Sequence, residues 1–269
     1  MTRPEMECGK MYSRRVFVEA IAGMSLSALP AQTGAQGTPR RADGQRRILV
    51  FDVNETMLDI NALAPLFARA FGNEQVLREW FSTLLLYSNV ATLAGPYADF
   101  GAIAGAALDM IASARGLSLT PPDRDAILAG IRTLPAHGDV RTGLGLLRKA
   151  GFRLVTLTNS APAAVEQQLE NAGLSDLFER SFSVDTVKRF KPAPEPYQYV
   201  ARELGVTTNR LRLVAAHAWD IAGALQAGCA AAFIASPGKV LYPLAPKPDV
   251  IAPDLVVAAD LILAAESAR

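Results

Sequence analysis

The chain has 269 residues, of which 50% are hydrophobic and 20% are charged, so it can bury a sizeable core and is neither a disordered nor a fibrous protein. Its 27 Lys and Arg residues nearly balance its 26 Asp and Glu residues, and the resulting formal charge of +1 argues against a nucleic acid or an anionic membrane as its partner. Two cysteines and two histidines are too few for a disulfide framework or a structural zinc site.

The chain begins with a segment that resembles a twin-arginine export signal. Residues 13–15 read Ser-Arg-Arg, an apolar run of about ten residues follows, and Pro30 ends the run. This run is roughly half as long as a membrane-spanning helix, so we expect no stable membrane anchor. The polar stretch 36–45 would form a linker after this signal. We therefore expect residues 1–45 to be a leader and linker, and the leader to direct the protein through the twin-arginine export machinery to the periplasm.

Two details depend on this leader. Ala31 or Ala35 offers a small-residue cleavage site, and cleavage at either would remove Cys8. Cys229 would then have no cysteine to pair with, so we expect no disulfide. The alternative interpretation is a disordered basic tail, which would leave the protein in the cytoplasm.

The next part of the chain alternates between strand and helix patterns. Short apolar runs predict strands buried on both faces at residues 48–51, 152–158, 211–216 and 230–234. Helix patterns that each end before a glycine cover residues 162–172, 194–204 and 219–227, the first after a capping signal at Asn159 and Ser160. This alternation predicts an α/β protein with a doubly wound, parallel, Rossmann-like sheet.

Residues 61–135 interrupt this alternation. They carry helix-period patterns without a convincing buried strand, at residues 63–71, 74–88, 101–115 and 122–133. We expect this segment to be an inserted helical cap over the carboxyl edge of the sheet, with residues 46–60 and 136–269 forming the core. Towards the C-terminus, the sequence predicts a loop at 239–253, an apolar run at 255–257 and a helix at 259–268.

Four polar clusters follow predicted strands. They occupy residues 52–56, 158–160, 188–192 and 217–220. Because the carboxyl ends of parallel strands meet at one edge of a sheet, we expect the clusters to converge there.

These clusters carry a resemblance to a known family. The order of an acid after the first strand, Thr after the second, Lys191 before Pro192, and Asp220 after a later strand resembles the haloacid dehalogenase (HAD) superfamily over residues 47–262. Residues 190–197, 218–224 and 80–87 look most like the type II 2-haloacid dehalogenases. The resemblance implies a hydrolase that acts on carbon–halide bonds of short 2-haloalkanoic acids, takes a small anionic substrate and needs no cofactor.

The resemblance also assigns catalytic roles. Asp52, a carboxylate at a strand end, would be the nucleophile that forms an aspartyl ester, rather than a simple helix cap. Thr56 would orient that carboxylate, or cap a turn. Lys191 would offset the negative charge of Asp52, Asp220 and the substrate, unless it is a solvated surface lysine. Asp220 would hold Lys191 and position the hydrolytic water, or serve as a helix cap.

Other residues are expected to bind substrate. The backbone N–H groups of Thr158 and Asn159, which precede a helix, would hold an anionic group or merely cap that helix. Tyr197 matches a family tyrosine whose hydroxyl helps to bind substrate. We also expect Trp219 and Phe81 to line the substrate site.

The sequence departs from the family at several positions. Phosphatases of the superfamily have a proton-donating Asp where this chain has Asn54, and an amide cannot be a general acid, which argues against phosphoryl transfer and leaves Asn54 as a substrate-binding residue. Phe81 replaces the usual cap Arg, for which Arg78 is a candidate substitute. His217 and Ala215 replace the usual Asn and Ser. We hypothesise that His217 is the base that hydrolyses the ester, the alternative being a hydrogen-bonded loop histidine.

Two other functions stay open. A Mg²⁺-dependent phosphatase or phosphonatase would use Asp52 and Asp220 to bind the metal, whereas the leading interpretation has no metal site. A non-catalytic, exported, anion-binding protein would keep the anion pocket without turnover. The oligomeric state is open as well: residues 81–87 are apolar enough for a homodimer interface or for the core, and we expect core.

Overall fold

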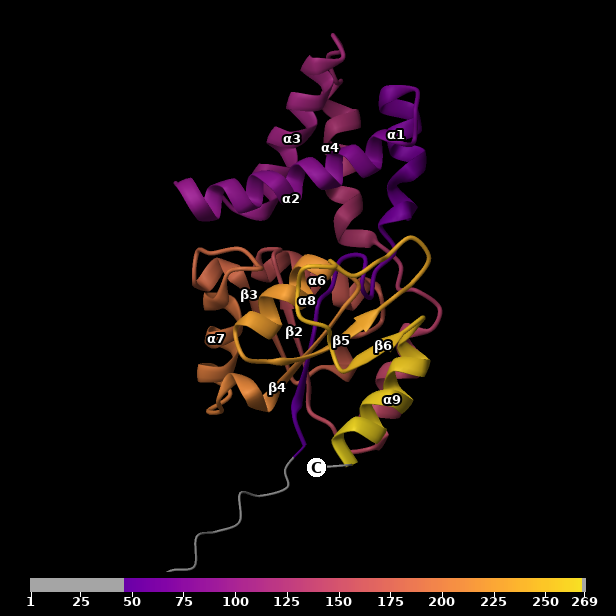
Figure 1. The fold of residues 1–269 in the computed structure, drawn as a ribbon. Coiled ribbons are helices and arrows are strands. Elements are labelled where there is room, and N and C mark those ends of the chain that lie inside the picture. The colour runs from indigo at the N-terminus through magenta and orange to yellow at the C-terminus, as the bar shows by residue number, and fades with distance from the viewer. Residues whose placement is uncertain (1–45, 268–269) are drawn as a thin grey trace, which may run out of the picture. The chain divides into compact units, whose positions relative to one another are not determined.

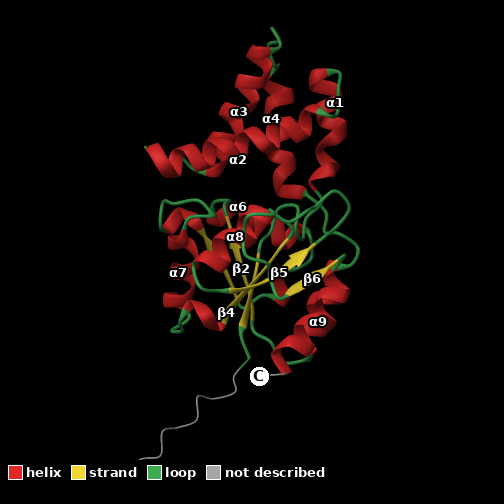
Figure 2. Cartoon of the chain, viewed as in Figure 1, coloured by secondary structure: helices red, strands yellow, loops and turns green. Residues whose placement is uncertain are grey.

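A parallel sheet forms the centre of the part of the chain that the structure, a computed structural model, describes: residues 46–267. The predicted leader and linker lie outside the described residues. The six strands of the sheet are β1 (Ile48–Phe51), β2 (Leu154–Thr158), β3 (Arg180–Ser183), β4 (Leu211–Ala215), β5 (Ala230–Ile234) and β6 (Val250–Ala252). Their order is β3-β2-β1-β4-β5-β6, and every pair is parallel. Figure 2 shows the strands in yellow with helices in red around them. The predicted doubly wound α/β class is confirmed.

The order of the strands places a crevice beside β1. The chain continues from β1 to β2 on one side and later returns to β4 on the other side. Phe51 at the end of β1 pairs with Thr156 of β2 and with Val214 of β4. Residues that follow these three strands therefore come together at the carboxyl edge, where open α/β sheets bind ligands.

Two strands and one helix do not appear among the sequence predictions. β3 carries two exposed polar residues, and β6 has three residues within a segment predicted to be a loop. Both strands lie at edges of the sheet, where one-sided pairing and exposure remove the continuous apolar run that marks a central strand. The helix α5 (Val140–Lys149) has polar residues on its outer face and was not predicted.

The helices of the core pack on both faces of the sheet. Right-handed crossovers place α6 (Pro162–Asn171) and α8 (Ala218–Gln226) on opposite faces, because β2 to β3 and β4 to β5 run outward in opposite directions. α7 (Pro194–Glu203) contacts α8, and α9 (Leu255–Ser267) contacts α5. The predicted run at 255–257 is the first turn of α9. The sequence predicted that Asn159 or Ser160 caps the N-terminus of α6. This is wrong, because Ala161 is the N-cap residue and no side chain makes a capping hydrogen bond.

A layer of helices lies over the carboxyl edge of the sheet (Figure 1). It consists of α1 (Ala64–Phe71), α2 (Val76–Ala94), α3 (Phe100–Ala114) and α4 (Pro121–Gly130). Trp80 is fully buried within this layer, packs against Phe67 and donates a hydrogen bond to the carbonyl of Ala104 at 2.9 Å. These helices are the segment predicted to form a cap.

The apolar stretch 81–87 of α2 divides between the interior and the surface. Phe81 and Leu84 are buried, whereas Leu86 and Tyr87 are exposed. The expectation that this stretch is core is therefore correct only for its inner face.

No helix among residues 46–267 combines the length and the hydropathy needed to cross a bilayer.

A buried cluster of charges joins the two ends of the described chain. The Glu266 carboxylate of α9 accepts hydrogen bonds from Arg47 just before β1 and from Arg212 of β4, both at 2.8 Å. Arg212 is fully buried and also pairs with Asp249 at 2.6 Å.

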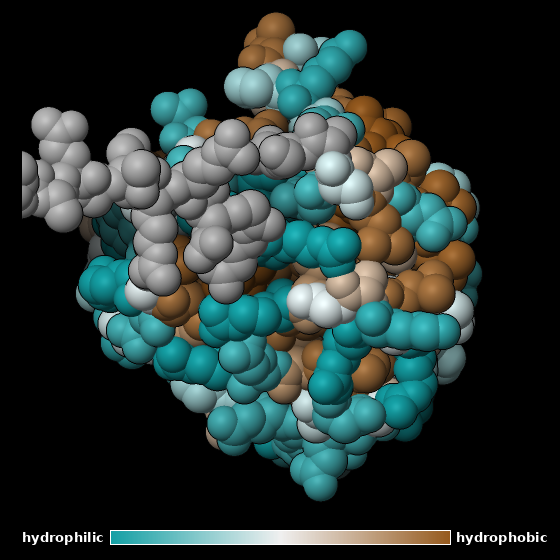
Figure 3. Space-filling view, turned by 90° about the horizontal axis from the view of Figure 1, so that it is seen from below, coloured by the Kyte–Doolittle hydropathy of each residue, from teal (hydrophilic) through white to brown (hydrophobic). Residues whose placement is uncertain are grey.

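The face seen from below carries many hydrophilic residues with hydrophobic residues between them (Figure 3).

Candidate active site

The site is organised around Asp52, the first residue after β1. The backbone N–H of Asp52 donates to the carbonyl of Val214 in β4, which fixes the backbone from which the side chain extends. Asp52 Oδ2 accepts a hydrogen bond from Thr56 Oγ1 at 2.6 Å. The same Thr56 hydroxyl accepts a hydrogen bond from the backbone N–H of Ala216 at 2.9 Å, so β4 holds the threonine in place.

Lys191 connects the carboxylates of the site. Its ammonium donates to Asp52 Oδ1 at 2.7 Å, to Asp220 Oδ2 at 2.6 Å and to the carbonyl of Leu157 at 3.0 Å. The three N–H donors are all used, and the residue is 1% exposed. It is not a solvated surface lysine.

Asp220 is held from two sides. Its Oδ2 contacts Lys191, and its Oδ1 accepts a hydrogen bond from the Tyr197 hydroxyl at 2.5 Å. Burial and the nearby Asp52 charge raise the pKa of Asp220 against the opposing effect of Lys191. Burial and Asp220 raise the pKa of Tyr197 well above its ordinary value, so its hydroxyl stays a donor.

The ionisation of Asp52 follows from the same contacts. Burial by itself raises the pKa of Asp52, but the Lys191 ammonium and the hydrogen bond from His217 lower it well below its ordinary value. Burial by itself lowers the pKa of Lys191, but the carboxylates of Asp220 and Asp52 together raise it above its ordinary value. A carboxylate anion and an ammonium therefore face each other over the neutral pH range.

Two contacts position the backbone around Lys191. Asn159 Oδ1 accepts a hydrogen bond from the Lys191 N–H at 3.1 Å. Gly223 of α8 lies against Pro192, and a Cβ atom at this glycine would lie 2.5 Å from the proline Cβ. Only a residue without a side chain allows α8, which carries Asp220, to approach the lysine segment this closely.

His217 lies between two carboxylates. Its Nδ1 is 3.0 Å from Asp52 Oδ2, and its Nε2 is 2.8 Å from Glu55 Oε2. Trp219 stacks on the ring with centroids 4.9 Å apart, and Phe81 lies at 6.2 Å. Burial lowers the pKa of His217, but the hydrogen bonds with Asp52 and Glu55 raise it above its ordinary value.

Sequence reasoning assigned no role to Glu55. Its acidic side chain lies in the cluster 52–56, but its partner His217 is 162 residues away. No local pattern reports such a contact; the adjacency of β1 and β4 produces it.

Two of the residues predicted to bind substrate, Asn54 and Thr158, have side chains that bond to other protein groups. The amide of Asn54 donates to Ser160 Oγ at 3.2 Å and accepts from Gln168 at 2.8 Å. Thr158 Oγ1 accepts a hydrogen bond from the Ser160 N–H at 3.1 Å. The other predicted residues surround Asp52 and its partners, and their roles toward a substrate stay predictions.

A cavity adjoins the site between the cap and the core. It has a volume of about 260 Å³, and Glu55, Phe81, Arg78 and Lys239 are among its lining residues. Arg78 is exposed and makes no ion pair among residues 46–267. Its side chain therefore adds a positive charge to the wall of this cavity, and its role as a substitute for the cap Arg stays a prediction.

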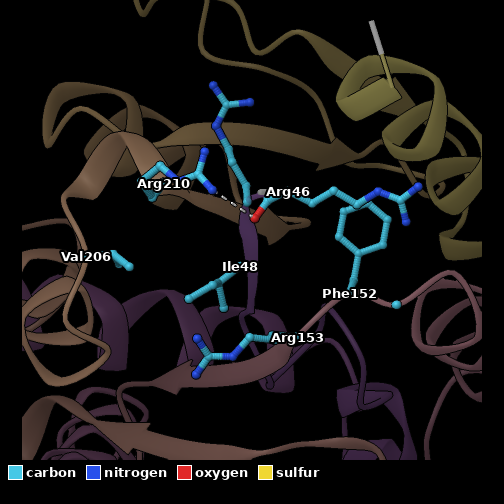
Figure 4. Close-up of a pocket in the computed structure, with 8 residues that line it drawn as sticks. Arg46, Ile48, Phe152, Arg153, Val206 and Arg210 are labelled. Carbon is cyan, nitrogen blue, oxygen red and sulfur yellow. Dashed lines mark hydrogen bonds between the residues drawn. The ribbon is translucent and has the colours of Figure 1, made fainter. Parts of the chain in front are cut away.

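A different cavity of about 310 Å³ lies at the amino ends of the strands, opposite the edge that carries Asp52. Figure 4 shows residues that line it. Arg46 donates to the carbonyl of Ala150 and lies over the ring of Phe152, and Arg153 pairs with Glu179 at 2.8 Å. Protein groups thus already engage these two positive charges.

The donor set does not fit a magnesium ion. The Lys191 ammonium lies within hydrogen-bond distance of both Asp52 and Asp220, so the two carboxylates that a magnesium ion would need already share one cation. No group of three or more His, Cys, Asp or Glu side chains with metal-site geometry occurs within the described range.

Comparison with known proteins identifies the family. The model of haloacid dehalogenase-like hydrolases matches residues 47–228. The chain belongs to this family. The predicted membership of this family is therefore confirmed.

Individual members of the family are similar over most of the chain. (S)-2-haloacid dehalogenase 1 of Pseudomonas sp. (strain CBS-3) is 33% identical over 66% of this chain and 79% of its own length. (S)-2-haloacid dehalogenase of Xanthobacter autotrophicus is 32% identical over 70% of this chain and 75% of its own length. The solved L-2-haloacid dehalogenase from Xanthobacter autotrophicus with chloropropionic acid covalently bound superposes with a TM-score of 0.77 at 26% identity, covering 81% of this chain and 99% of that one.

Proposed function

We propose that this chain is a hydrolytic dehalogenase of short 2-haloalkanoic acids, with Asp52 as its nucleophile. The observation that carries the proposal is the buried carboxylate of Asp52, which accepts hydrogen bonds from the Lys191 ammonium and the Thr56 hydroxyl. The family relatives named 2-haloacid dehalogenases, one of them solved with chloropropionic acid covalently bound, support this class of substrate and a covalent intermediate.

The hydrogen bonds distinguish the two oxygens of the nucleophile. Asp52 Oδ1 accepts one hydrogen bond, from Lys191, whereas Oδ2 contacts both Thr56 and His217. Oδ1 therefore keeps a lone pair for attack. It forms a bond to the carbon that bears the halogen, the carbon–halogen bond breaks, and the halide leaves with the bonding electron pair. The result is an aspartyl ester in which the Asp52 charge is gone and the substrate keeps its own carboxylate.

Water completes the reaction. It adds to the Asp52 carboxyl carbon, the bond between that carbon and Oδ1 breaks, and the 2-hydroxy acid leaves. One proton of the water goes to the departing alcohol oxygen, and the regenerated carboxyl releases the other to solvent. Halide departure needs no proton donor, so neither step requires a cofactor.

The Mg²⁺-dependent phosphatase or phosphonatase is the weaker alternative. Asn54 has no acidic proton to give to a leaving group, and both ends of its amide already bind protein groups.

Halide release from chloroacetate and from each enantiomer of 2-chloropropionate tests the proposal. We expect halide release that EDTA does not affect and that Asp52→Asn abolishes. We also expect a preference for the (S) enantiomer, because the relatives are named (S)-2-haloacid dehalogenases. EDTA-sensitive phosphate release from a phosphate ester, without halide release, would favour the phosphatase. Binding of a haloacid without product would favour the non-catalytic anion-binding protein.

We also propose that the leader acts as a twin-arginine signal and that the protein works in the periplasm. The Ser-Arg-Arg at residues 13–15 and the short apolar run after it support this. Cell fractionation compares the wild type with a variant in which Arg14 and Arg15 are both replaced by Lys. The wild type should appear in the periplasm and the variant in the cytoplasm.

We further propose a homodimer formed through α2. Leu86, Val90 and Leu93 lie at helical spacing on one face of α2 and are exposed, Leu93 by 85%. Light scattering should give the mass of two chains, and Leu93→Arg should reduce it to one.

A further inference from the structure

We propose that Glu55 is a positioning residue, which holds the His217 ring as a hydrogen-bond donor on Asp52 Oδ2. There the ring, protonated at both nitrogens and so positively charged, stabilises the oxyanion that forms when water attacks the aspartyl ester. This inference rests on the proposed ester chemistry of Asp52, and it assigns a role to a residue that the sequence analysis left without one.

The partners of His217 determine what the ring can do. Asp52 Oδ2 lies 3.0 Å from Nδ1, and Glu55 Oε2 lies 2.8 Å from Nε2. An ionised carboxylate only accepts hydrogen bonds, so both ring nitrogens must carry a proton. A general base needs a nitrogen with a free lone pair. The hypothesis that His217 takes a proton from water therefore does not fit this geometry.

The setting of Glu55 supports a dedicated role. Its φ is 60°, in the left-handed region that residues other than glycine rarely adopt. Both of its carboxylate oxygens are engaged, Oε2 by His217 and Oε1 by Lys239 at 3.0 Å. The carbonyl of Glu55 lies 3.4 Å from His137 Nε2. These contacts hold the glutamate in its unusual conformation with the carboxylate facing His217.

Within residues 46–267, the ring of His217 contacts no charged side chains other than those of Asp52 and Glu55. Asp52 and Glu55 face its two nitrogens, and the charges of Lys191 and Lys239 act through these carboxylates. The uncharged aromatic rings of Trp219 of α8 and Phe81 of the cap stack on the ring, with centroids 4.9 Å and 6.2 Å away.

The proposed step involves Asp52 Oδ2. After Oδ1 has bonded to the substrate carbon, Oδ2 is the carbonyl oxygen of the ester and keeps its contacts with Thr56 and His217. Water adds to the carboxyl carbon, and the electron pair of the C=O bond moves to Oδ2. Two donors, at 2.6 Å and 3.0 Å, already point at the oxygen where the negative charge develops. When the intermediate collapses, the carbonyl re-forms and the alcohol leaves.

Ring ¹⁵N NMR of the free protein at pH 7.5 tests the positioning without any substrate. We expect two protonated nitrogens on His217 in the wild type and a neutral ring in Glu55→Gln. The matched control is Glu74→Gln, which removes the charge of an exposed glutamate on the cap and should match the wild type. A His137→Gln variant assigns the signals. Equal protonation of His217 in Glu55→Gln and the wild type would overturn the positioning role.

Single-turnover kinetics with 2-chloropropionate test the step. In Glu55→Gln, the first-turnover halide release should stay within about threefold of the wild type, while ester hydrolysis should slow by about 100-fold. The ester should then accumulate as an added mass on the intact protein. Equal slowing of both steps would indicate a general structural defect and overturn the proposed step, as would wild-type hydrolysis. If the wild type releases no halide at all, the proposed function fails together with this step, whereas the NMR result still decides whether Glu55 positions His217.

Discussion

At the scale of single residues, the charge on Asp52 depends on Lys191. Burial alone raises the pKa of Asp52, and the ammonium 2.7 Å away is the main reason that this pKa is low. Lys191→Met leaves Asp52 and Asp220 buried without their shared cation, so the pKa of Asp52 should rise. We expect first-turnover halide release at pH 7 to fall at least about 100-fold and its acid limb to move to higher pH. The pH profile of halide release measures both effects.

Lys188→Met is the matched control for this prediction. Lys188 is three residues away and lies over the ring of Tyr97, with Nζ 4.7 Å from the ring centroid, and it does not contact Asp52. Its variant should keep the acid limb of the wild type. An unshifted acid limb in Lys191→Met would show that Lys191 does not control the ionisation of Asp52.

At the scale of elements, the cap helix α2 holds the segment that carries Lys191. Thr92 Oγ1 accepts a hydrogen bond from the Phe190 N–H at 2.9 Å, and the carbonyl of Thr92 accepts one from Arg189. Thr92→Val keeps the shape of the side chain but leaves the buried Phe190 N–H without an acceptor, at a cost of about 1–3 kcal/mol. We expect a lower free energy of unfolding and slower halide release, measured by denaturant titration and by the first turnover.

Thr83→Val makes the same substitution in α2 at a position with no hydrogen bond to the segment before Lys191. It should change neither quantity appreciably. If Thr92→Val lowered the free energy of unfolding but left the first turnover unchanged, the cap would stabilise the fold without positioning Lys191.

At the scale of the whole molecule, Glu266 joins the C-terminal helix α9 to the first and fourth strands. Burial raises the pKa of Glu266, but Arg212 and Arg47 lower it below its ordinary value. Glu266→Gln leaves the buried Arg212 and Arg47 short of a negative charge, and we expect a loss of about 3–5 kcal/mol of unfolding free energy at pH 7. Denaturant titration measures this loss.

The pH dependence of that loss follows from the direction of the shift. A carboxylate whose pKa is lower in the folded state contributes stability that is fully present above its unfolded pKa, near 4.5, and is lost as the pH falls through the folded value. The difference between wild type and Glu266→Gln should therefore shrink below pH 4.5. Glu203→Gln, which breaks an exposed ion pair with Arg180, should cost at most about 1 kcal/mol. A difference that stayed constant down to pH 3 would contradict the ionic role of Glu266.

The sequence by itself determined the central strands, and it predicted Asp52 as the nucleophile. β1, β2, β4 and β5 were predictable because strands buried on both faces must be continuously apolar. Asp52 and Thr56 were predictable as neighbours because only four residues separate them. The edge strands β3 and β6 were not, since exposure breaks their apolar pattern.

Only the tertiary structure decided how the distant polar groups meet. Lys191 contacts Asp52 across 139 residues, and His217 contacts Glu55 across 162. The parallel pairing of β1 with β2 and β4 brings the ends of these strands together, and the burial that results makes the charges depend on one another. The sequence could name His217 as a candidate base. Its place between two carboxylates, which makes it a hydrogen-bond donor, is a property of the folded chain, because strand adjacency rather than local sequence sets the distance between β1 and β4.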